Sequence, residues 1–534
     1  MPIPGGPRPV SPPPRTLTEA AAHLRHPLSG ASVRVSGVTL SSRTVRPGDL
    51  YAALPGARVH GARFAAQAAD AGAVAVLTDP AGREILSAAG VLLPCVVVPE
   101  PRAVLGGLAA WLYGDPGKSL STYGVTGTNG KTTTTFLIDS ALRALGRTTG
   151  LIGTIEIRVA GERVTSTGTT PEAPDLHALL AVMVERGVEA CSMEISSHAL
   201  VQHRTDGLVV DVAGFTNLSQ DHLDYHGTLK EYFAAKALLF TPAHAARGVV
   251  CVDDDWGLRL LDRAEIPVVS VRTRPRRPGE PPADWQVTAV RPRGDGRTAV
   301  VVDSPAGSLA LTSPLPGDFN VANTLVAVAM LVESGIDAEQ AGLALAAASV
   351  VPGRMEPVAG TGTAGEPLVI VDYAHTPDAV AAALRALAGQ GHPLVVVLGA
   401  GGDRDADKRP LMGAAAAEAA DVVLVTDDNP RSEDPAAIRA AVVEGAQRAA
   451  KDSGAEVLEI PERRDAIIEG VHQAWGGVLL LAGKGHEQGQ EIAGHVSSFD
   501  DRVVAREVLE TVARAHDETS FENHPRQSEK ESLS

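Results

Sequence analysis

Short apolar runs alternate along most of the chain with stretches of helical character, and this alternation sets the expected fold. Runs at 73–79 (AVAVLTD) and 95–100 (CVVVPE) indicate strands of a small first domain. A second domain carries apolar runs at 188–193, 209–215 and 248–252, with helices between them. Strands that alternate with helices are typical of a mostly parallel, doubly wound sheet. The pattern therefore predicts an α/β protein.

A third domain is expected after residue 350, with four strands that each end in a polar stretch. The strands are predicted at 368–371, 394–398, 422–425 and 478–481. In an open parallel sheet, ligands bind outside the carboxyl ends of the strands. The polar stretches therefore predict a binding site, with ordinary solvated loops as the alternative. They occupy residues 372–375, 399–404, 427–431 and 483–487.

The two ends of the chain lack apolar periodicity, so we predict a disordered Pro-rich arm at 1–15 and a disordered tail at 514–534. Between them we place a smaller α/β N-terminal domain (16–116) and a central P-loop domain with a doubly wound, mostly parallel sheet (117–350). A C-terminal domain with a Rossmann-like sheet follows at 351–513. The sequence thus predicts three domains.

Composition and charge narrow the class of partner. The net charge of −17 disfavours nucleic acid or an anionic membrane, because both require a basic face. Cys95, Cys191 and Cys251 each lie in a Val-rich or small-residue run, which indicates buried core positions rather than redox chemistry. There is no secretory h-region and no membrane-length apolar run, so we expect a cytoplasmic protein.

Residues 123–136 (YGVTGTNGKTTTTF) predict a phosphate site at the start of a helix. The standard Walker A spacing fails, because Val125 stands where a Gly is required and Gly127 supplies the turn instead. A chance turn before a helix is the alternative. Lys131 would neutralise the β- and γ-phosphates, and Thr132 would bind Mg²⁺. The predicted ATP-binding loop comprises Gly127, Thr128, Asn129, Gly130, Lys131, Thr132 and Thr133.

Two further segments suggest metal binding. Glu194 follows the strand at 188–193 and is a candidate second anchor for Mg²⁺, with a salt-bridged Glu as the equal alternative. The segment FTNLSQDHLDYHG places His222 and His226 four residues apart, as in a zinc pair, but no Cys or Glu-x-x-His context completes such a site. The residues alone therefore favour a solvated polar turn there.

Nine motifs in the same order make the chain similar to the Mur ligases: GVTGTNGKTTT, MEISSHALVQHR, FTNLSQDHLDYHG, AAKALLF, GRME, DYAHTPD, GGDRDADKRPLMG, TDDNPR and AGKGHE. The resemblance extends from about residue 36 to residue 510, and the altered P-loop spacing is this family's own form. Within the family, the diaminopimelate-adding members match best. The resemblance implies an ATP-dependent, ADP-forming amide ligase of peptidoglycan precursor synthesis, and hence of cell-wall growth and division.

The implied reaction uses ATP to phosphorylate a carboxylate of UDP-MurNAc-L-Ala-D-Glu, and the amine of diaminopimelate then attacks the acyl phosphate. Mg²⁺ is the implied cofactor, and a monomer is expected. Meso- and LL-diaminopimelate both remain open. Because the ATP phosphates and the substrate carboxylate are both anions, the site needs positive charge and correct positioning rather than a side-chain nucleophile.

The resemblance also implies roles for individual residues. Thr132 and Glu194 would hold one Mg²⁺ and His222 a second, and Lys236 would be carbamylated and help to place the metal. The implied catalytic residues are Lys131, Lys236, His222 and Arg354, and further ATP contacts would come from Asn323, Arg354, Asp372 and His375. UDP-MurNAc-dipeptide would contact Leu40, Ser42, Thr169, Thr170, Ser196, Gln202 and Arg204.

The implied diaminopimelate site lies at the ends of the C-terminal strands. Arg431 would bind the distal carboxylate as a bidentate fork and Glu487 the distal ammonium; a surface salt bridge from Arg431 to Glu433 or Asp434 is the alternative. The full set is Arg404, Asp428, Asn429, Pro430, Arg431, Gly483 and Glu487. A ligase like folylpolyglutamate synthetase and a non-catalytic, nucleotide-gated binding protein remain the alternative functions.

Overall fold

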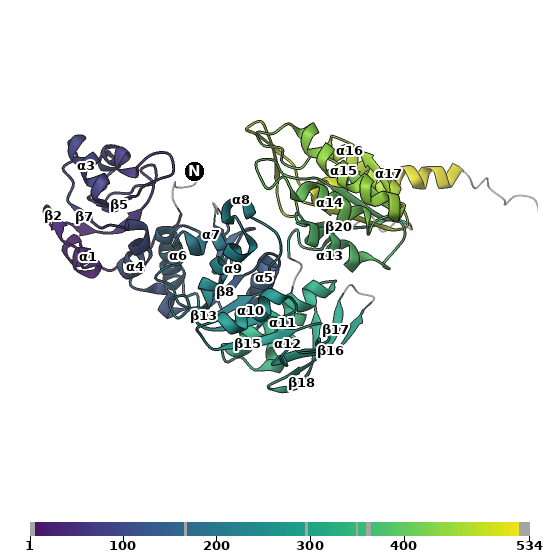
Figure 1. Cartoon of the computed structure of the whole chain (residues 1–534), viewed down its shortest axis with the longest axis horizontal. Coiled ribbons are helices and arrows are strands. Elements are labelled where there is room, and N and C mark those ends of the chain that lie inside the picture. The colour runs from purple at the N-terminus through teal and green to yellow at the C-terminus, as the bar shows by residue number, and fades with distance from the viewer. Residues whose placement is uncertain (1–5, 165–167, 294–296, 349–350, 359–364, 523–534) are drawn as a thin grey trace, which may run out of the picture. The chain divides into compact units, whose positions relative to one another are not determined.

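The computed structural model describes residues 6–164, 168–293, 297–348, 351–358 and 365–522, with side chains described as far as residue 514 (Figure 1). The chain forms two compact units. The first comprises Met1–Ser219, His226–Pro314 and Phe319–Ser349, and the second comprises Gln220–Tyr225, Leu315–Asp318 and Val350–Ser534. The domain limit at residue 116 lies inside the first unit and stays a prediction.

The first unit begins with a small α/β sheet, drawn in purple in Figure 1. The strand order is β2-β7-β6-β5-β4, parallel except for the β2–β7 pair. The strands are β2 (Leu28–Ser29), β4 (Gly37–Thr39), β5 (Asp49–Ala53), β6 (Ala75–Thr78) and β7 (Cys95–Val97), and β1 (Arg15–Thr16) pairs separately with β3 (Arg34–Val35). The helices are α1 (Leu17–Leu24), α2 (Ala65–Asp70), α3 (Pro80–Ala88) and α4 (Pro101–Leu112), with 3-10 turns at Gly61–Phe64 and Pro116–Ser119.

The larger sheet of the first unit has the order β11-β10-β9-β12-β8-β13-β14-β15-β16-β17-β18 within the described residues. Its strands are β8 (Ser121–Thr126), β9 (Thr149–Ile152), β10 (Ile157–Val159), β11 (Glu162–Val164), β12 (Ala190–Glu194), β13 (Val210–Phe215), β14 (Ala245–Cys251), β15 (Val268–Arg272), β16 (Trp285–Pro292), β17 (Thr298–Ser304) and β18 (Gly307–Ser313). From β9 to β16 the pairing is parallel, and the strands outside this range pair antiparallel.

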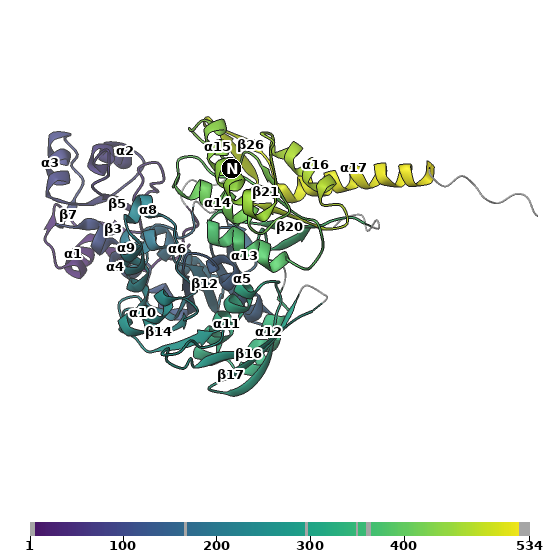
Figure 2. The ribbon, with the colours of Figure 1, turned by 45° about the vertical axis from the view of Figure 1, so that its right-hand side comes forward.

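Helices cover both faces of this sheet, as the change of view in Figure 2 makes visible. Successive residues of one strand enter different apolar clusters: Ala213 and Phe215 of β13 pack on one face, whereas Val212 packs on the other. The helices are α5 (Lys131–Ala144), α6 (Ala173–Glu185), α7 (Ser197–Val201), α8 (Leu223–His226), α9 (Leu229–Ala237), α10 (Asp255–Arg263), α11 (Asp318–Glu333) and α12 (Ala338–Ala346), with a 3-10 turn at Leu238–Phe240. The predicted doubly wound sheet is confirmed.

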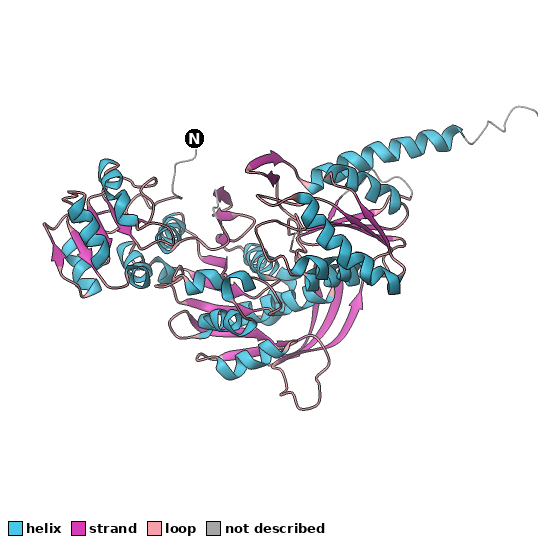
Figure 3. Ribbon diagram, turned by 45° about the horizontal axis from the view of Figure 1, so that its top comes forward, coloured by secondary structure: helices cyan, strands magenta, loops and turns pink. Residues whose placement is uncertain are grey.

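The second unit contains the sheet β19-β20-β24-β21-β22-β23, parallel except at β19. Its strands are β19 (Glu356–Val358), β20 (Leu368–Asp372), β21 (Leu394–Leu398), β22 (Val422–Val425), β23 (Glu456–Glu459) and β24 (Val478–Ala482), and β25 (Gly489–Ile492) forms a hairpin with β26 (His495–Ser498). The helices, cyan in Figure 3, are α13 (Pro377–Leu387), α14 (Lys408–Ala417), α15 (Pro435–Ser453), α16 (Arg463–Gln473) and α17 (Asp501–Glu522). The order confirms a Rossmann-like sheet.

Most predicted strands lie within a few residues of the observed ones, and β21 and β22 coincide with the prediction. Cys95, Cys191 and Cys251 are buried on strands, as predicted. Burial raises the pKa of the Cys191 thiol to about 12, so it stays protonated near neutral pH. None of the helices described is long and apolar enough to cross a membrane.

The structure differs from the prediction near both ends of the chain. In the N-terminal arm, the Val10 and Ser11 amides donate to Glu185 of α6 at 2.9 Å each, and Arg8 lies 3.7 Å from Asp49. At the other end, α17 continues to Glu522, so residues 514–522 are helical. Low apolar content predicted disorder, but polar contacts to a folded surface and the continuation of a packed helix order these residues instead. Residues 523–534 lie outside the described part.

Candidate functional site

The P-loop connects β8 to α5, and two glycines make its turn possible. Gly127 has φ 151° and Gly130 has φ 88°, a backbone region that favours glycine. A Cβ on Gly127 would lie 1.9 Å from the Thr216 hydroxyl, and a Cβ on Gly130 would lie 2.2 Å from Asn323 Oδ1. The loop therefore passes close to its neighbours and enters α5 at Lys131, where the helix N-terminus favours an anion.

Two lysines direct their ammonium groups at the carbonyl groups of this loop. Lys131 Nζ donates to Gly127 O at 2.9 Å and to Thr128 O at 2.8 Å. Lys236 on α9 is 1% exposed, donates to Gly127 O at 2.6 Å and lies 4.4 Å from the centre of the Tyr232 ring. Two ammonium groups at one carbonyl concentrate positive charge where the helix N-terminus already favours an anion. The loop is therefore suited to a polyphosphate.

Glu194, at the end of β12, lies directly beside the P-loop helix. Its Oε1 accepts from Thr132 Oγ1 at 3.0 Å and from the Thr154 amide at 2.8 Å, and its Oε2 accepts from Thr154 Oγ1 at 3.1 Å. Glu194 is 1% exposed, and these three contacts join its carboxylate to two hydroxyls and an amide rather than to a cation. A carboxylate and two hydroxyls form a hard oxygen set of the kind that Mg²⁺ takes together with water and phosphate.

The residues predicted to hold the sugar and peptide gather around the same strand end. Thr170 Oγ1 donates to Glu194 O at 2.9 Å and accepts from the Ser196 amide at 3.1 Å. Arg204 donates to Thr170 O at 3.2 Å and to Gln202 Oε1 at 2.7 Å. Thr169 also joins this group, through its hydroxyl contact with Thr154 at 2.9 Å. The structure thus brings together five of the seven predicted residues.

The other two predicted residues, Leu40 and Ser42, follow β4 in the small sheet. Ser42 Oγ donates to Gln67 Oε1 at 3.0 Å, and Leu40 is partly exposed. On α11 of the large sheet, Asn323 lies against Gly130 and donates to Asn320 Oδ1 at 3.1 Å. The predicted adenine contact is therefore next to the P-loop.

His222 and His226 do not share surroundings. His226 Nε2 lies 2.9 Å from Ser197 Oγ and its ring lies 5.0 Å from that of Tyr232, inside the first unit. His222 belongs to the segment Gln220–Tyr225 of the second unit, where its Nε2 lies 3.5 Å from Asp221 Oδ2. Among the described residues, no three His, Cys, Asp or Glu side chains form a metal cluster. The arrangement gives no support to a zinc pair.

In the second unit, Asp372, at the end of β20, accepts from the Met355 amide at 2.7 Å. Burial raises the pKa of Asp372 to about 6, and the Arg354 charge opposes this rise. The Arg354 guanidinium lies 4.5 Å from the centre of the Tyr373 ring. Burial, with the Lys408 charge, lowers the pKa of His375, whose Nδ1 lies 2.8 Å from Tyr373 O. Three predicted nucleotide contacts therefore surround one strand end.

The predicted amino-acid residues converge at the ends of β22 and β24. Asn429 Nδ2 donates to Glu487 Oε2 at 2.7 Å, although the two residues are 58 positions apart. Gly483 has φ 108°, and a Cβ there would lie 3.3 Å from Asp428 Oδ2. Lys484, with its side chain fully buried, lies between Asp428 and Glu487 at 3.5 and 3.4 Å.

Arg431 follows Pro430 in this loop and has φ 52°. Its Nη1 donates to Gly402 O at 2.7 Å, and its Nε lies 3.7 Å from Glu491 Oε2. Glu433, a partner of Arg431 in the alternative interpretation, pairs with Arg409 at 2.8 Å. Arg404 is exposed and donates to the carbonyl of Asp403 at 3.0 Å. The Ser432 hydroxyl donates to Asp403 Oδ1 at 2.6 Å. Because Asp403 precedes Arg404 and Ser432 follows Arg431, this bond joins the two loops that carry the arginines.

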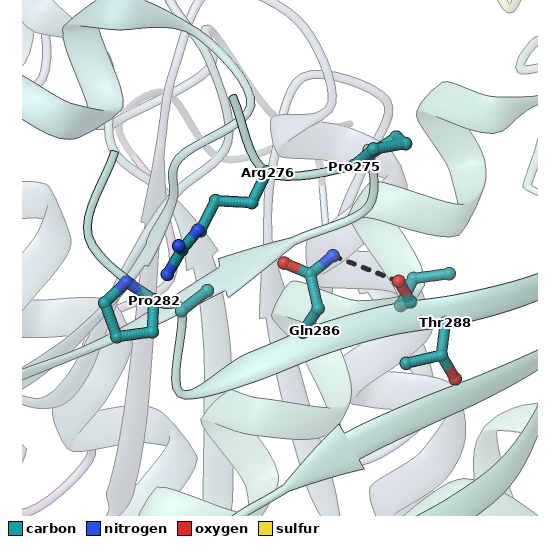
Figure 4. A pocket seen from close by; sticks show the side chains of 7 residues that line it. Pro275, Arg276, Pro282, Gln286 and Thr288 are labelled. Atoms are coloured by element: carbon teal, nitrogen blue, oxygen red, sulfur yellow. Dashed lines mark hydrogen bonds between the residues drawn. The ribbon is translucent and has the colours of Figure 1, made fainter. Parts of the chain in front are cut away.

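A pocket of about 420 Å³ follows β15, but it carries none of these residues (Figure 4). Gln286 lines it and donates from Nε2 to Val287 O at 3.0 Å, the dashed line in Figure 4. Arg276 is the only ionisable residue among those that line it. They are Pro275, Arg276, Pro282, Ala283, Gln286, Val287 and Thr288. The pocket shows no group suited to the chemistry described above.

Sequence reasoning missed three residues of these clusters. Thr154 donates twice to Glu194, Lys484 occupies the centre of the amino-acid cluster, and Lys408 lies 3.7 Å from Asp221. Lys408 and Lys484 stand in the DADKRPLMG and AGKGHE motifs, and a lysine in the polar segment that follows a buried strand was the available signal. Thr154 had no local signal, because only the fold brings it beside Glu194.

The fold and these clusters define an α/β protein with a nucleotide-binding P-loop in its first unit. In its second unit, charged residues gather at the carboxyl ends of the parallel strands. Three family models match in chain order: the catalytic domain of the Mur ligase family (34–113), the Mur ligase middle domain (125–331) and the Mur ligase glutamate ligase domain (353–485). A relative from Streptomyces coelicolor, named UDP-N-acetylmuramoyl-L-alanyl-D-glutamate--2,6-diaminopimelate ligase, is 50% identical over 95% of this chain and 99% of its own. The chain belongs to the Mur ligase family.

Solved structures agree with this placement. A structure of a UDP-N-acetylmuramoyl-L-alanyl-D-glutamate--2,6-diaminopimelate ligase is 33% identical, covers 90% of this chain and 95% of its own, and has a TM-score of 0.62. A Mycobacterium tuberculosis folylpolyglutamate synthase complexed with ADP and AMPPCP is 20% identical, covers 80% of this chain and 96% of its own, and has a TM-score of 0.56. The second likeness concerns the fold alone.

Proposed function

We propose that this chain is an ATP-dependent, ADP-forming amide ligase that joins diaminopimelate to UDP-MurNAc-L-Ala-D-Glu in peptidoglycan precursor synthesis. Relatives of that name cover nearly its whole length. The observation that carries the proposal is the paired charge at one loop: Arg431 stands beside the cluster of Asp428 and Glu487. Diaminopimelate carries a distal carboxylate and a distal ammonium on one carbon, and this loop offers a partner to each.

The chain's main task is to bring two anions together. Lys131 and the N-terminus of α5 supply positive charge at the P-loop. The ATP phosphates and the substrate carboxylate repel each other in solution, and positioned cations offset that repulsion as the acyl phosphate forms. Arg354 and His375 would contact the phosphates, Asp372 the ribose and Asn323 the adenine.

The oxygen atoms of Thr132 and Glu194 suit Mg²⁺, and His222 would bind a second ion. When bound, Mg²⁺ would withdraw charge from the phosphate oxygens. Lys236 has the burial and the P-loop contact expected of a carbamylated lysine, because carbamylation needs a neutral amine and burial favours that form. The modification would turn a cation into an anion close to the metal.

The UDP-MurNAc-dipeptide would extend from the small sheet to the P-loop strand. Leu40 and Ser42 would contact the uridine end, and the group around Thr170 and Arg204 would hold the sugar and peptide. Arg204 is part of an ion pair, with its Nε 3.0 Å from Glu172 Oε1, so a substrate carboxylate would share or replace that partner. Both substrates and ATP are cytoplasmic metabolites, and we place the enzyme there.

The test is phosphate release from ATP by the purified full-length chain. We expect release only when UDP-MurNAc-L-Ala-D-Glu and diaminopimelate are both present with Mg²⁺, together with the tripeptide product by mass spectrometry. Release that requires a folate and glutamate would support the folylpolyglutamate synthetase alternative. Tight ATP binding without turnover under any combination would support a nucleotide-gated binding protein.

A further inference from the structure

A single buried lysine lies at the centre of the proposed amino-acid site. Lys484 lies two residues beyond the end of β24, its side chain is fully buried, and its ammonium donates to Gly489 O at 2.7 Å. The same Nζ lies 3.4 Å from Asn429 Oδ1, 3.4 Å from Glu487 Oε2 and 3.5 Å from Asp428 Oδ1. Its neighbours come from the ends of two strands and from β25. The ammonium therefore joins three segments of the site.

The charges around this lysine do not balance. Asp428 and Glu487 supply two carboxylates, and Lys484 supplies one ammonium. Arg463, a buried cation that interacts with Asp428 and Glu487, is already paired with Asp501 through bonds of 2.8 and 2.7 Å. One negative charge is therefore left for a ligand cation, which is the charge of the distal ammonium of diaminopimelate.

Building on the proposed function, we propose that Lys484 is a positioning residue that holds Asp428, Asn429 and Glu487 in the arrangement and charge that receive the distal ammonium. Lys484 makes no contact with the substrate itself in this proposal. Its three N–H donors are directed at the backbone carbonyl and at the loop side chains, so it acts through them. The lysine allows two carboxylates to approach each other in a buried site.

The surroundings of Glu487 make the role measurable. Burial raises the pKa of Glu487, the Asp428 charge raises it further, and Lys484 and the Asn429 amide oppose the rise. Tyr373 and Arg463 also feel the Glu487 charge. Without Lys484, Glu487 holds its proton to higher pH, and a protonated Glu487 cannot pair with an ammonium.

The experiment compares wild type with Lys484→Met, which keeps the length of the side chain and removes the charge. We expect kcat/KM for diaminopimelate to fall about 30-fold or more, mainly through KM, with the KM values for ATP and UDP-MurNAc-L-Ala-D-Glu within about 3-fold of wild type. The acid limb of the pH profile should move up by about one unit. Lys451→Met, an exposed position on α15, is the matched control and should behave as wild type.

An unchanged acid limb, or an equal loss for all three substrates, would overturn the proposal, because a structural role alone predicts that result. If Lys484→Met does not fold, the double variant Glu487→Gln/Lys484→Met is compared with Glu487→Gln instead. The double variant also removes one of the carboxylates whose charge Lys484 compensates. There Lys484→Met should cause little additional loss in kcat/KM for diaminopimelate; an independent loss of the same size as in wild type would refute the coupling.

A measurement without turnover separates this proposal from the proposed function. The ¹³C resonance of the Glu487 carboxyl, assigned by its loss in Glu487→Gln, is titrated in wild type and in Lys484→Met. A higher pKa in Lys484→Met supports the positioning role, and an equal pKa contradicts it. If wild type shows no diaminopimelate-dependent turnover, the proposed function fails, while this titration still decides what Lys484 does to Glu487.

Discussion

Replacing Arg431 by Ala tests the choice of amino acid most directly. The guanidinium donates to Gly402 O at 2.7 Å and lies 3.7 Å from Glu491, which holds it at the loop edge. Arg431 has φ 52°, and Ala must adopt the same strained backbone, so the substitution leaves that strain in place. The folded state should lose about 1.5–3 kcal/mol, the contribution of one hydrogen bond from a charged donor, and remain stable enough to assay.

The expected loss of activity is separate from this loss of stability. Truncating one partner of a buried charge pair costs about 2–5 kcal/mol, mostly because the other charge is left without its partner. The Arg431 side chain is 24% exposed, so water takes over part of its role and the lower part of that range applies. A cost of about 2–3 kcal/mol corresponds to a fall of about 30- to 150-fold in kcat/KM for diaminopimelate.

The assay compares kcat/KM for diaminopimelate and for L-lysine in wild type, Arg431→Ala and Arg431→Lys. Lysine lacks the distal carboxylate, so its rate should change little in either variant. Arg431→Lys keeps the positive charge but loses the bidentate geometry of the guanidinium. Its activity with diaminopimelate should therefore lie between those of Arg431→Ala and wild type. Equal use of the two amino acids by wild type, or an unchanged ratio in Arg431→Ala, would show that this loop does not choose the substrate.

Three further predictions concern other parts of the chain. Lys131→Ala should abolish phosphate release while binding of the UDP-substrate, followed by calorimetry, survives; normal turnover would refute the P-loop assignment. Lys236→Ala should be inactive and partly rescued by formate or acetate, and mass spectrometry of wild type should show a carbamate on this side chain; a fully active variant would contradict the proposal. Burial lowers the pKa of His486 to about 3 from 6.5, so the folded chain binds fewer protons between these values and loses stability as the pH falls through them. His486 should contribute about 1.4 kcal/mol of lost folding stability per pH unit, and His486→Gln should remove this contribution. The measurement is the urea midpoint of wild type and of His486→Gln at pH 5 and at pH 6.5. Identical midpoints for the two proteins at both pH values would argue against the prediction.

The local pattern of the chain carried most of the information about its strands. Residues 394–398 and 422–425 are continuous apolar runs, the first bounded by Pro and Gly and the second by Asp and Thr, and β21 and β22 occupy the same positions. A strand buried on both faces must be apolar at every position, so its limits can be read from the chain. The start of α5 was similarly visible, because Gly130 and Lys131 end the turn and begin the helix.

The ends of the chain show where composition misleads. Residues 514–522 are rich in polar side chains, yet they continue α17, whose earlier turns pack Val504 and Leu509 into the core. Val10 and Ser11 are ordered by Glu185, a residue 175 positions away from Val10. Composition measures the apolar surface that a segment can bury, but it does not show which distant surface the segment meets.

The sequence determined which residues carry charge and which strand ends they follow. Only the tertiary structure decided their partners: Asn429 meets Glu487, Thr154 meets Glu194, and Lys484 joins the ends of β22 and β24. Each of these contacts depends on the order of strands in a parallel sheet, in which neighbours are far apart along the chain. That order follows from the packing of helices on both faces, a property of the whole domain that no short stretch of sequence encodes.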